Sequence, residues 1–294
     1  MNLKRVLSLG VDLVSEAAWR LNPGRSTGSR VPVLCYHRIL PDFSEPQTPV
    51  YFIPPKTFAA HLERFRSRGF AFLGLDDYAA IAAGRREAPE RAVLVSIDDG
   101  FADVLPLVPM LKDLDARLTL FLTTSAIGKD GPLYMTAPTP AMSAHAAAHP
   151  DLWRTLTWSE VRNLAGHGVS FGLHGHQHRP LAAFSPAELA GQLEEAKALF
   201  RRELGAAPTA FALPYGHPSS YNTQLLRVIA DAGIELVFST TTGRSPLPAR
   251  QLPLSRLVVL NHHTQDDLEK MALGSRDWLG AIKRRLAPSL PVSF

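Results

Sequence analysis

Two adjacent carboxylates, Asp98 and Asp99, follow an apolar run over 92–97 and precede Gly100. Adjacent negative charges repel each other, and a bound cation would offset that repulsion. One carboxylate could then bind a metal ion while the other stays available as a base. A turn that merely ends a strand is the structural alternative for the same residues.

Three histidines, His174, His176 and His178, follow a second apolar run. His174 and His178 are four residues apart, so a helical turn or a tight loop brings both imidazoles to one face. With Asp99 they form the ligand set typical of a catalytic zinc site, which leaves a coordination position for water. We therefore expect Asp99, His174 and His178 to bind a divalent metal ion, most simply zinc. Asp98 is then the candidate base that takes a proton from water.

A rigid turn, Pro214-Tyr215-Gly216, follows a third apolar run. Proline fixes one backbone dihedral angle, and glycine permits an unusual one. Such a turn could hold the Tyr215 N–H toward an oxygen atom on which negative charge develops. An ordinary connection between a strand and a loop is the alternative interpretation of this turn.

Short β-rich runs alternate with longer helical periodicities, which is typical of a parallel α/β architecture. We expect strands over 31–36, 92–97, 118–123, 169–173, 210–213, 236–240 and 257–260. The expected helices cover 55–69, 76–83, 104–114, 159–168, 185–204 and 222–233. Seven parallel strands predict a distorted (β/α) barrel, whose chemistry belongs at the C-terminal ends of the strands.

The pattern predicts one barrel domain over 30–286. An amphipathic helix and a linker over 1–29 precede it, and a tail over 287–294 follows it. The segment 129–154 is rich in proline, alanine and histidine and lacks a clear periodicity. We expect it to form a long loop over the active face.

The motifs resemble those of the polysaccharide deacetylases of carbohydrate esterase family 4, the NodB homology domain. Residues 96–100 resemble the family's Thr-Phe-Asp-Asp-Gly motif, 174–178 its His-x-x-x-His motif and 214–216 its third motif. Residues 33–38 resemble the opening strand of members from bacterial exopolysaccharide and cell-envelope pathways. Three motifs in the family's order are far more specific than any one of them.

The resemblance implies a role for each matching residue. Asp98 would be the catalytic base, Asp99, His174 and His178 the metal ligands, and the Tyr215 amide a donor to the oxyanion. The implied activity is a metal-dependent hydrolysis that releases acetate. The substrate would carry N-acetyl groups, or less typically O-acetyl groups, on an amino sugar, oligosaccharide or polysaccharide.

One departure from the family concerns an arginine that often precedes the proline of the third motif and orients the base. Ala212 and Leu213 stand in that neighbourhood here. Arg256, just ahead of a late strand, is a candidate replacement that could reach the mouth of the barrel. We count Arg256 and Pro214 among the residues that position or bind substrate.

The general acid of the family is usually a histidine in a late Leu-x-His motif. His262, in Leu260-Asn261-His262, matches that position, and His263 and His217 compete with it. Four aromatic side chains are candidates to line a sugar-binding groove or to pack in the core: Tyr36, His37, Trp153 and Trp158.

Two other functions stay open at this point. The pair His174 and His176 also matches the His-x-His motif of amidohydrolases, which would make His176 a metal ligand. A non-catalytic glycan-binding protein that keeps the fold is the second alternative, because the usual arginine is missing and the acid is uncertain.

Composition limits the partners and the location. The chain has 294 residues and a formal net charge of +4, but the basic excess is too diffuse to indicate nucleic-acid binding. Charged residues interrupt the N-terminal apolar stretch, so we expect no signal peptide and a cytoplasmic location, with the inner membrane face as one alternative. The N-terminal helix would dock on its own domain or contact a membrane peripherally. The single cysteine, Cys35, excludes an intrachain disulfide.

Overall fold

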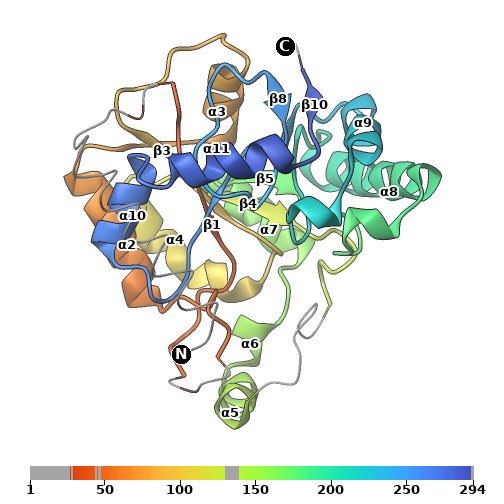
Figure 1. Ribbon diagram of the computed structural model, residues 1–294. Coiled ribbons are helices and arrows are strands. Elements are labelled where there is room, and N and C mark those ends of the chain that lie inside the picture. The colour runs from red at the N-terminus through yellow and green to blue at the C-terminus, as the bar shows by residue number, and fades with distance from the viewer. Residues whose placement is uncertain (1–26, 28, 44, 46–47, 130–138, 293–294) are drawn as a thin grey trace.

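The computed structural model describes residues 27, 29–43, 45, 48–129 and 139–292 (Figure 1). The amphipathic helix expected over the N-terminal segment lies outside the described residues. Within the described part, no helix is both long enough and apolar enough to cross a bilayer.

Eight parallel strands form one curled sheet, and the seven expected strands are all among them. The order is β7-β6-β5-β4-β3-β1-β9, and the additional β2 pairs with β3. The distorted (β/α) barrel is thereby confirmed. The strands are β1 (Val33–Tyr36), β2 (Ala71–Leu73), β3 (Ala92–Ile97), β4 (Thr119–Leu122), β5 (Ser170–Leu173), β6 (Ala210–Ala212), β7 (Leu236–Phe238) and β9 (Leu257–Val258).

One short segment contacts both edges of the curled sheet. Leu254 forms a parallel bridge with Phe238 at the end of β7. Three residues further along the chain, β9 pairs with β1 at the opposite edge, with Leu257 beside Leu34. The segment therefore closes the barrel and brings Arg256, which lies between the two contacts, into the interior.

Helices pack around the sheet (Figure 1). Side-chain caps fix the N-termini of five of the described helices, α5, α7, α8, α9 and α10: at the start of α8, for example, the Ser185 hydroxyl accepts a hydrogen bond from the Glu188 N–H. The helices are α2 (Pro55–Ser67), α3 (Leu75–Ala82), α4 (Val108–Asp113), α5 (Pro140–Ala148), α6 (Pro150–Trp153), α7 (Trp158–Gly166), α8 (Pro186–Leu204), α9 (Thr223–Asp231), α10 (Gln265–Ala272) and α11 (Asp277–Leu286).

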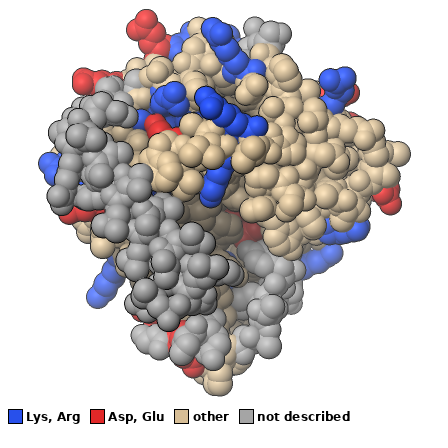
Figure 2. Space-filling view, viewed as in Figure 1, with Lys and Arg blue, Asp and Glu red and all other residues tan. Residues whose placement is uncertain are grey.

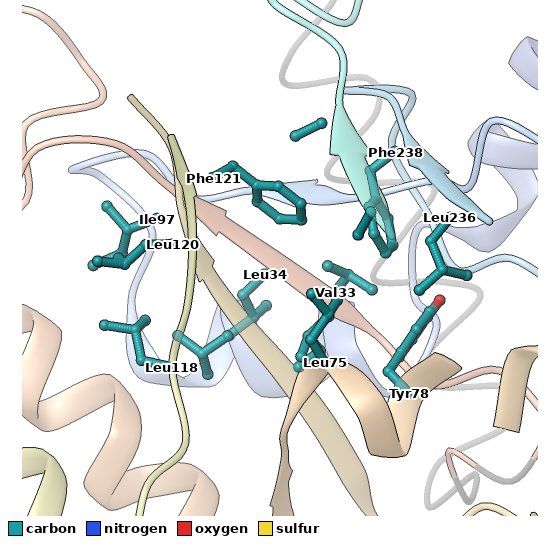
Figure 3. Packing of buried hydrophobic residues seen from close by; sticks show 14 of the residues in the cluster. Val33, Leu34, Leu75, Tyr78, Ile97, Leu118, Leu120, Phe121, Leu236 and Phe238 are labelled. Carbon is teal, nitrogen blue, oxygen red and sulfur yellow. The ribbon is translucent and has the colours of Figure 1, made fainter. Parts of the chain in front are cut away.

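The main core fills the inside of the curled sheet and the space beneath α3. In Figure 3, Leu34, Phe121 and Phe238 point from three strands into one cluster that also receives Tyr78 from α3. The Tyr78 and Phe238 rings lie 5.7 Å apart. Burial of apolar side chains at about 25 cal/mol per Å² makes this cluster the main stabilising element of the fold.

The expected loop over 129–154 is wrong in its second half, because α5 and α6 occupy it and lie away from the main body in Figure 1. Thr139 caps α5, Pro140 occupies its first turn, and alanine has the highest helix propensity. Hydrophobic periodicity missed this helix since little of it is buried. Met142 and Trp153 pack with Leu40 and Phe52 in a small separate cluster.

The C-terminal residues also differ from the expected tail. Leu290–Pro291 forms β10, which pairs antiparallel with β8 (Gln251–Leu252). Both strands are only two residues long, too short to leave a recognisable alternation in the sequence.

Candidate active site

Polar residues follow three strands of the barrel, and the turn 214–216 follows a fourth, at the same edge of the sheet. Tyr36 of β1 lies beside Ile97 of β3, and Leu122 of β4 beside Leu173 of β5. Because these strands are parallel, the residues that come next meet at the C-terminal mouth of the barrel. Those residues are His37 after β1, Asp98 and Asp99 after β3, His174 after β5 and Pro214 after β6.

Asp99, His174 and His178 form a buried cluster at this mouth, with one ligand atom of each within 4.8 Å of the others. The Asp99 Oδ1 lies 3.4 Å from His174 Nε2 and 3.3 Å from His178 Nε2. Donors bound at about 2.0–2.1 Å around a tetrahedral ion are separated by about 3.3 Å. The three residues therefore have both the chemistry and the spacing that a zinc-type ion requires.

A hydrogen bond orients the first of these histidines. His174 Nδ1 lies 2.8 Å from the Ala212 carbonyl oxygen at the end of β6. This contact turns Nε2, the other ring nitrogen, toward Asp99, as is usual for histidines that bind metals. The neighbouring strand β6 thus determines how a β5 residue presents its ring.

Three of the predicted site residues have positive φ angles: Asp99 at 80°, His178 at 49° and Tyr215 at 62°. Among residues other than glycine this conformation is uncommon and costs about 1–3 kcal/mol. Such strain persists where the surroundings over-determine the backbone, and it concentrates at functional sites. The strained backbone therefore marks the same end of the barrel as the side-chain cluster.

Asp98 is held by Arg256 in a two-pronged ion pair inside the barrel. The distances are 2.7 Å from Nη1 to Oδ1 and 2.8 Å from Nη2 to Oδ2. Both side chains are at most 1% exposed. Arg256 also donates from Nε to the Ser239 carbonyl, 3.2 Å away. Such complete burial leaves Arg256 to orient Asp98 rather than to contact a substrate.

The pKa values of the carboxylates follow from these contacts. Burial alone would raise the pKa of Asp98, but the Arg256 guanidinium outweighs it and holds the pKa below its ordinary value. Burial likewise opposes ionisation of Asp99, whose pKa the hydrogen bonds of His174 and His178 hold well below its ordinary value. Both groups are therefore carboxylates at neutral pH, which suits one as a base and the other as a ligand.

His37 reaches the same site from β1, a position for which sequence reasoning proposed only groove lining or core packing. It groups with Cys35 and Asp98, with one ligand atom of each within 4.8 Å of the others. The His37 ring is partly exposed, and its centroid lies 5.5 Å from that of Tyr51. Burial lowers the pKa of His37, against the pull of Asp99 and Asp98. The sequence feature that could have identified His37 as a site residue is its position directly after an inner strand.

Two other histidines point elsewhere. His262 is exposed, and its ring centroid lies 4.8 Å from that of His263. His176 Nδ1 contacts the Thr124 hydroxyl at 2.8 Å, and its Nε2 lies 3.2 Å from Glu195. Among the described residues, neither belongs to a group spaced to hold a metal ion. The described residues therefore do not form an amidohydrolase-type site in which His176 is a metal ligand.

The turn 214–216 lies beside the cluster. The Tyr215 ring is 54% exposed, and its centroid lies 5.2 Å from that of His178. The Tyr215 carbonyl accepts a hydrogen bond from the Thr240 hydroxyl. At Gly216 an added Cβ would lie 2.6 Å from the Thr240 nitrogen, so only glycine fits there. Pro214, the residue before the exposed Tyr215, is buried.

Comparison with known families identifies the chain. The family model described as polysaccharide deacetylase matches residues 85–237, which is just over half of the sequence. The chain belongs to the polysaccharide deacetylase family. The matched region includes Asp98, Asp99, His174, His178 and Tyr215, and the expected enzyme class is confirmed at the level of the family.

Known deacetylases resemble the chain in sequence or in fold. The Bacillus subtilis protein YxkH, named as a polysaccharide deacetylase, is 22% identical over 232 residues, covering 79% of this chain and 72% of YxkH. The Streptococcus pyogenes deacetylase PplD, solved in complex with acetate, aligns with a TM-score of 0.67 at 21% identity, covering 84% and 99% of the two chains. IcaB from Ammonifex degensii also aligns with a TM-score of 0.67 at 21% identity, covering 85% and 100%.

Proposed function

We propose that this deacetylase-family protein is a metal-dependent hydrolase that removes acetyl groups from the nitrogen of an amino sugar, within an oligosaccharide or polysaccharide. The observation that carries the proposal is that the candidate metal site and the candidate base lie next to each other. The buried cluster of Asp99, His174 and His178 lies directly beside Asp98, whose carboxylate is held by Arg256. The solved relative with bound acetate, PplD, supports the acetyl group.

Asp99, His174 and His178 would hold the ion. When bound there, a divalent ion such as zinc supplies a Lewis acid that lowers the pKa of water and polarises the acetyl carbonyl. The three side chains are at most 8% exposed. Water is therefore largely excluded around the charges, which strengthens every electrostatic interaction of the site.

Asp98 would accept the proton of the attacking water. The water oxygen forms the bond to the acetyl carbon, the bond from that carbon to nitrogen breaks, and acetate leaves. Arg256 keeps Asp98 ionised and fixes both of its oxygens. A fixed carboxylate is an effective base because no reorientation is needed during the reaction.

His37 would give a proton to the leaving nitrogen. It lies near Asp98 at the mouth, whereas His262 is exposed and faces His263. A lowered pKa makes the His37 imidazolium a stronger acid toward the amine. The Tyr215 backbone N–H, in its strained turn beside His178, would donate to the oxyanion.

The proposal is tested by metal content and acetate release, measured together. Protein purified without chelator is analysed for bound metal and incubated with N-acetylglucosamine oligomers, for the wild type and His174→Ala. We expect one metal ion per chain and acetate release, with both lost in the variant. A metal-free wild type, or a His174→Ala variant that keeps its metal and its activity, would contradict the proposal.

The proton donor is tested by a matched pair of histidine variants. We expect His37→Gln to lower kcat by about a hundredfold or more while metal content is retained. His262→Gln changes an exposed side chain and should keep kcat within about twofold. A larger loss in His262→Gln than in His37→Gln would restore the assignment made from the sequence.

A further inference from the structure

A second pocket lies on the flank of the barrel, with a volume of about 810 Å³. It is enclosed by α11, by the ribbon of β8 and β10, and by the chain that leaves β7. Asp98, Asp99, His174 and His178 do not line it. Ser239 lies between the two sites, since it lines the pocket and its carbonyl accepts a hydrogen bond from Arg256.

The lining of this flank pocket is positively charged. Arg250, Arg284 and Arg285 line it, and no aspartate or glutamate does. Within the described part of the chain, none of these arginines forms an ion pair. Three guanidinium groups around one pocket repel each other unless an anion joins them.

Two buried hydroxyls in the same pocket are available to a ligand. Tyr221 is 3% exposed and Thr241 is 4% exposed. The Tyr221 hydroxyl lies within reach of the Thr241 and Ser239 hydroxyls, but in the described structure neither Tyr221 Oη nor Thr241 Oγ1 forms a hydrogen bond of good geometry. Buried polar atoms normally form well-aligned hydrogen bonds, so these two hydroxyls remain able to donate to the acceptor atoms of a ligand.

Arg284 is fixed in position without a counter-charge. Its Nη1 donates to the Ser255 hydroxyl at 2.9 Å. Burial and the nearby Arg30 lower the pKa of Arg284, and Asp277 only partly opposes them because it already pairs with Arg244 at 2.9 Å. A half-buried guanidinium that lacks a carboxylate is unfavourable, and an anionic ligand would relieve that cost.

We propose that the flank pocket binds an organic phosphate ester. Guanidinium forks match the oxygens of a phosphate, and Arg250, Arg284 and Arg285 would contact that group together with the two hydroxyls. The volume exceeds what a phosphate ion alone would fill and lies in the range of small-molecule sites. Leu247 and Leu252 in the lining would contact the organic part.

Two kinds of molecule carry such a phosphate ester, a soluble metabolite and a lipid headgroup. Beside the pocket, α11 exposes Ile282 at 53% and Leu286 at 83%. Lysine and arginine side chains gather over and around this helix in Figure 2. Apolar side chains flanked by basic ones are typical of helices that contact anionic lipid surfaces.

Calorimetric titration of the full chain with hexyl phosphate tests the pocket, with hexanol and inorganic phosphate as controls. We expect hexyl phosphate to bind more tightly than either control. Arg250→Gln and Arg284→Gln should each weaken it by about tenfold or more. Lys283→Gln, an equal loss of charge on α11 outside the pocket, should change it by less than about twofold. Tyr221→Phe, which removes only the hydroxyl, tests the pocket even if Arg284→Gln fails to fold.

Absence of binding, or equal weakening by Lys283→Gln and the pocket variants, would overturn the proposal. Sedimentation with phosphatidylcholine vesicles that contain phosphatidic acid then separates the sources. Vesicle binding that is lost in Arg284→Gln and kept in Lys283→Gln supports a lipid ester. Binding of hexyl phosphate without vesicle binding supports a soluble ester.

Discussion

Two buried ion pairs lie close together at the barrel mouth, and the pKa values of their carboxyl groups are shifted in opposite directions. Asp98 pairs with Arg256 through two contacts of 2.7 and 2.8 Å. Asp103 pairs with Arg38 through one contact of 2.7 Å, from Nε to Oδ2. All four side chains are at most 1% exposed, so burial does not distinguish the two pairs.

The pKa values of the two carboxyls diverge nevertheless. Burial raises the pKa of Asp103, the Asp99 carboxylate adds to this effect, and the contacts with Arg38 and the Ile39 N–H do not overcome it. For Asp98 the same burial is outweighed by Arg256, with help from His174. At equal burial, the charges of both signs around each carboxyl therefore set the direction of its pKa shift.

Arg38 instead has structural contacts. Its guanidinium carbon lies 3.8 Å from the Phe101 ring centroid, and its Nη2 donates to the Leu152 carbonyl in α6. The Arg38 pair thus fastens α6 to the end of β1, while the Arg256 pair fixes the candidate base. The two pairs are alike in burial, and we expect one to be structural and the other to position the base.

Asp98→Asn against Asp103→Asn is the strongest test of this division. Asp98→Asn should lower acetate release by about 10²–10⁴-fold with metal content retained, because the base is gone. Asp103→Asn should keep most activity and lower the thermal midpoint. Comparable activity losses in both variants would show that Asp103 also takes part in the chemistry.

Arg38→Met should lower the free energy of unfolding by about 3–5 kcal/mol, because it leaves Asp103 buried without its cation. The matched control is Arg64→Met, in the partly exposed pair with Asp266 and Glu269. That change should cost no more than about 1 kcal/mol. Urea unfolding of both variants provides the measurement, and equal losses would remove the structural role of Arg38.

Arg256→Lys keeps the charge and removes the two-pronged contact. We expect kcat to fall by about ten- to a hundredfold, because Asp98 is less well oriented. In a plot of kcat/KM against pH, the acidic limb should move to higher pH because the pKa of Asp98 rises. Arg38→Lys should leave that limb in place. An unshifted profile in Arg256→Lys would contradict the link between the arginine and the base.

The smallest expected effect is in the pH dependence of stability, measured on metal-free protein. The lowered pKa of Asp98 stabilises the fold above its unfolded value of about 3.9, and this is lost as pH falls through the folded pKa. The raised pKa of Asp103 has the opposite sign, so its contribution becomes more favourable as pH falls toward the unfolded value.

Urea unfolding of the wild type, Asp98→Asn and Asp103→Asn from about pH 7 to about pH 3 checks these signs. On acidification the stability of the wild type relative to Asp98→Asn should shrink, and relative to Asp103→Asn it should grow. Parallel curves for the two variants would mean that the two carboxyls ionise alike.

Much of the fold was predictable, because its strands are local and apolar. The run 92–97 is buried throughout as β3, and its sequence alone indicates a strand. The strand β2 was missed, since three residues after a helix carry no pattern. The helix α5 was missed because alanine propensity, not periodicity, forms it.

The candidate site was predictable where its residues stand next to strand ends. Asp99, His174 and His178 belong to short motifs, and parallel strands bring such motifs together. Their roles as ligands, like that of Asp98 as base, stay predictions until metal and activity are measured. His37 was not predicted as a proton donor, because the family's late Leu-x-His motif pointed to His262, although His37 directly follows the buried strand β1.

The sequence by itself determined the barrel, the family and the motifs at the strand ends, because these depend on local apolar patterns and short spacings. Only the tertiary structure decided that Arg256 reaches Asp98, that His37 lies nearer to it than His262, and that three arginines surround one flank pocket. Those juxtapositions join distant segments of the chain. They are set by the closure of the barrel and by the need to pair buried charges, which no local pattern records.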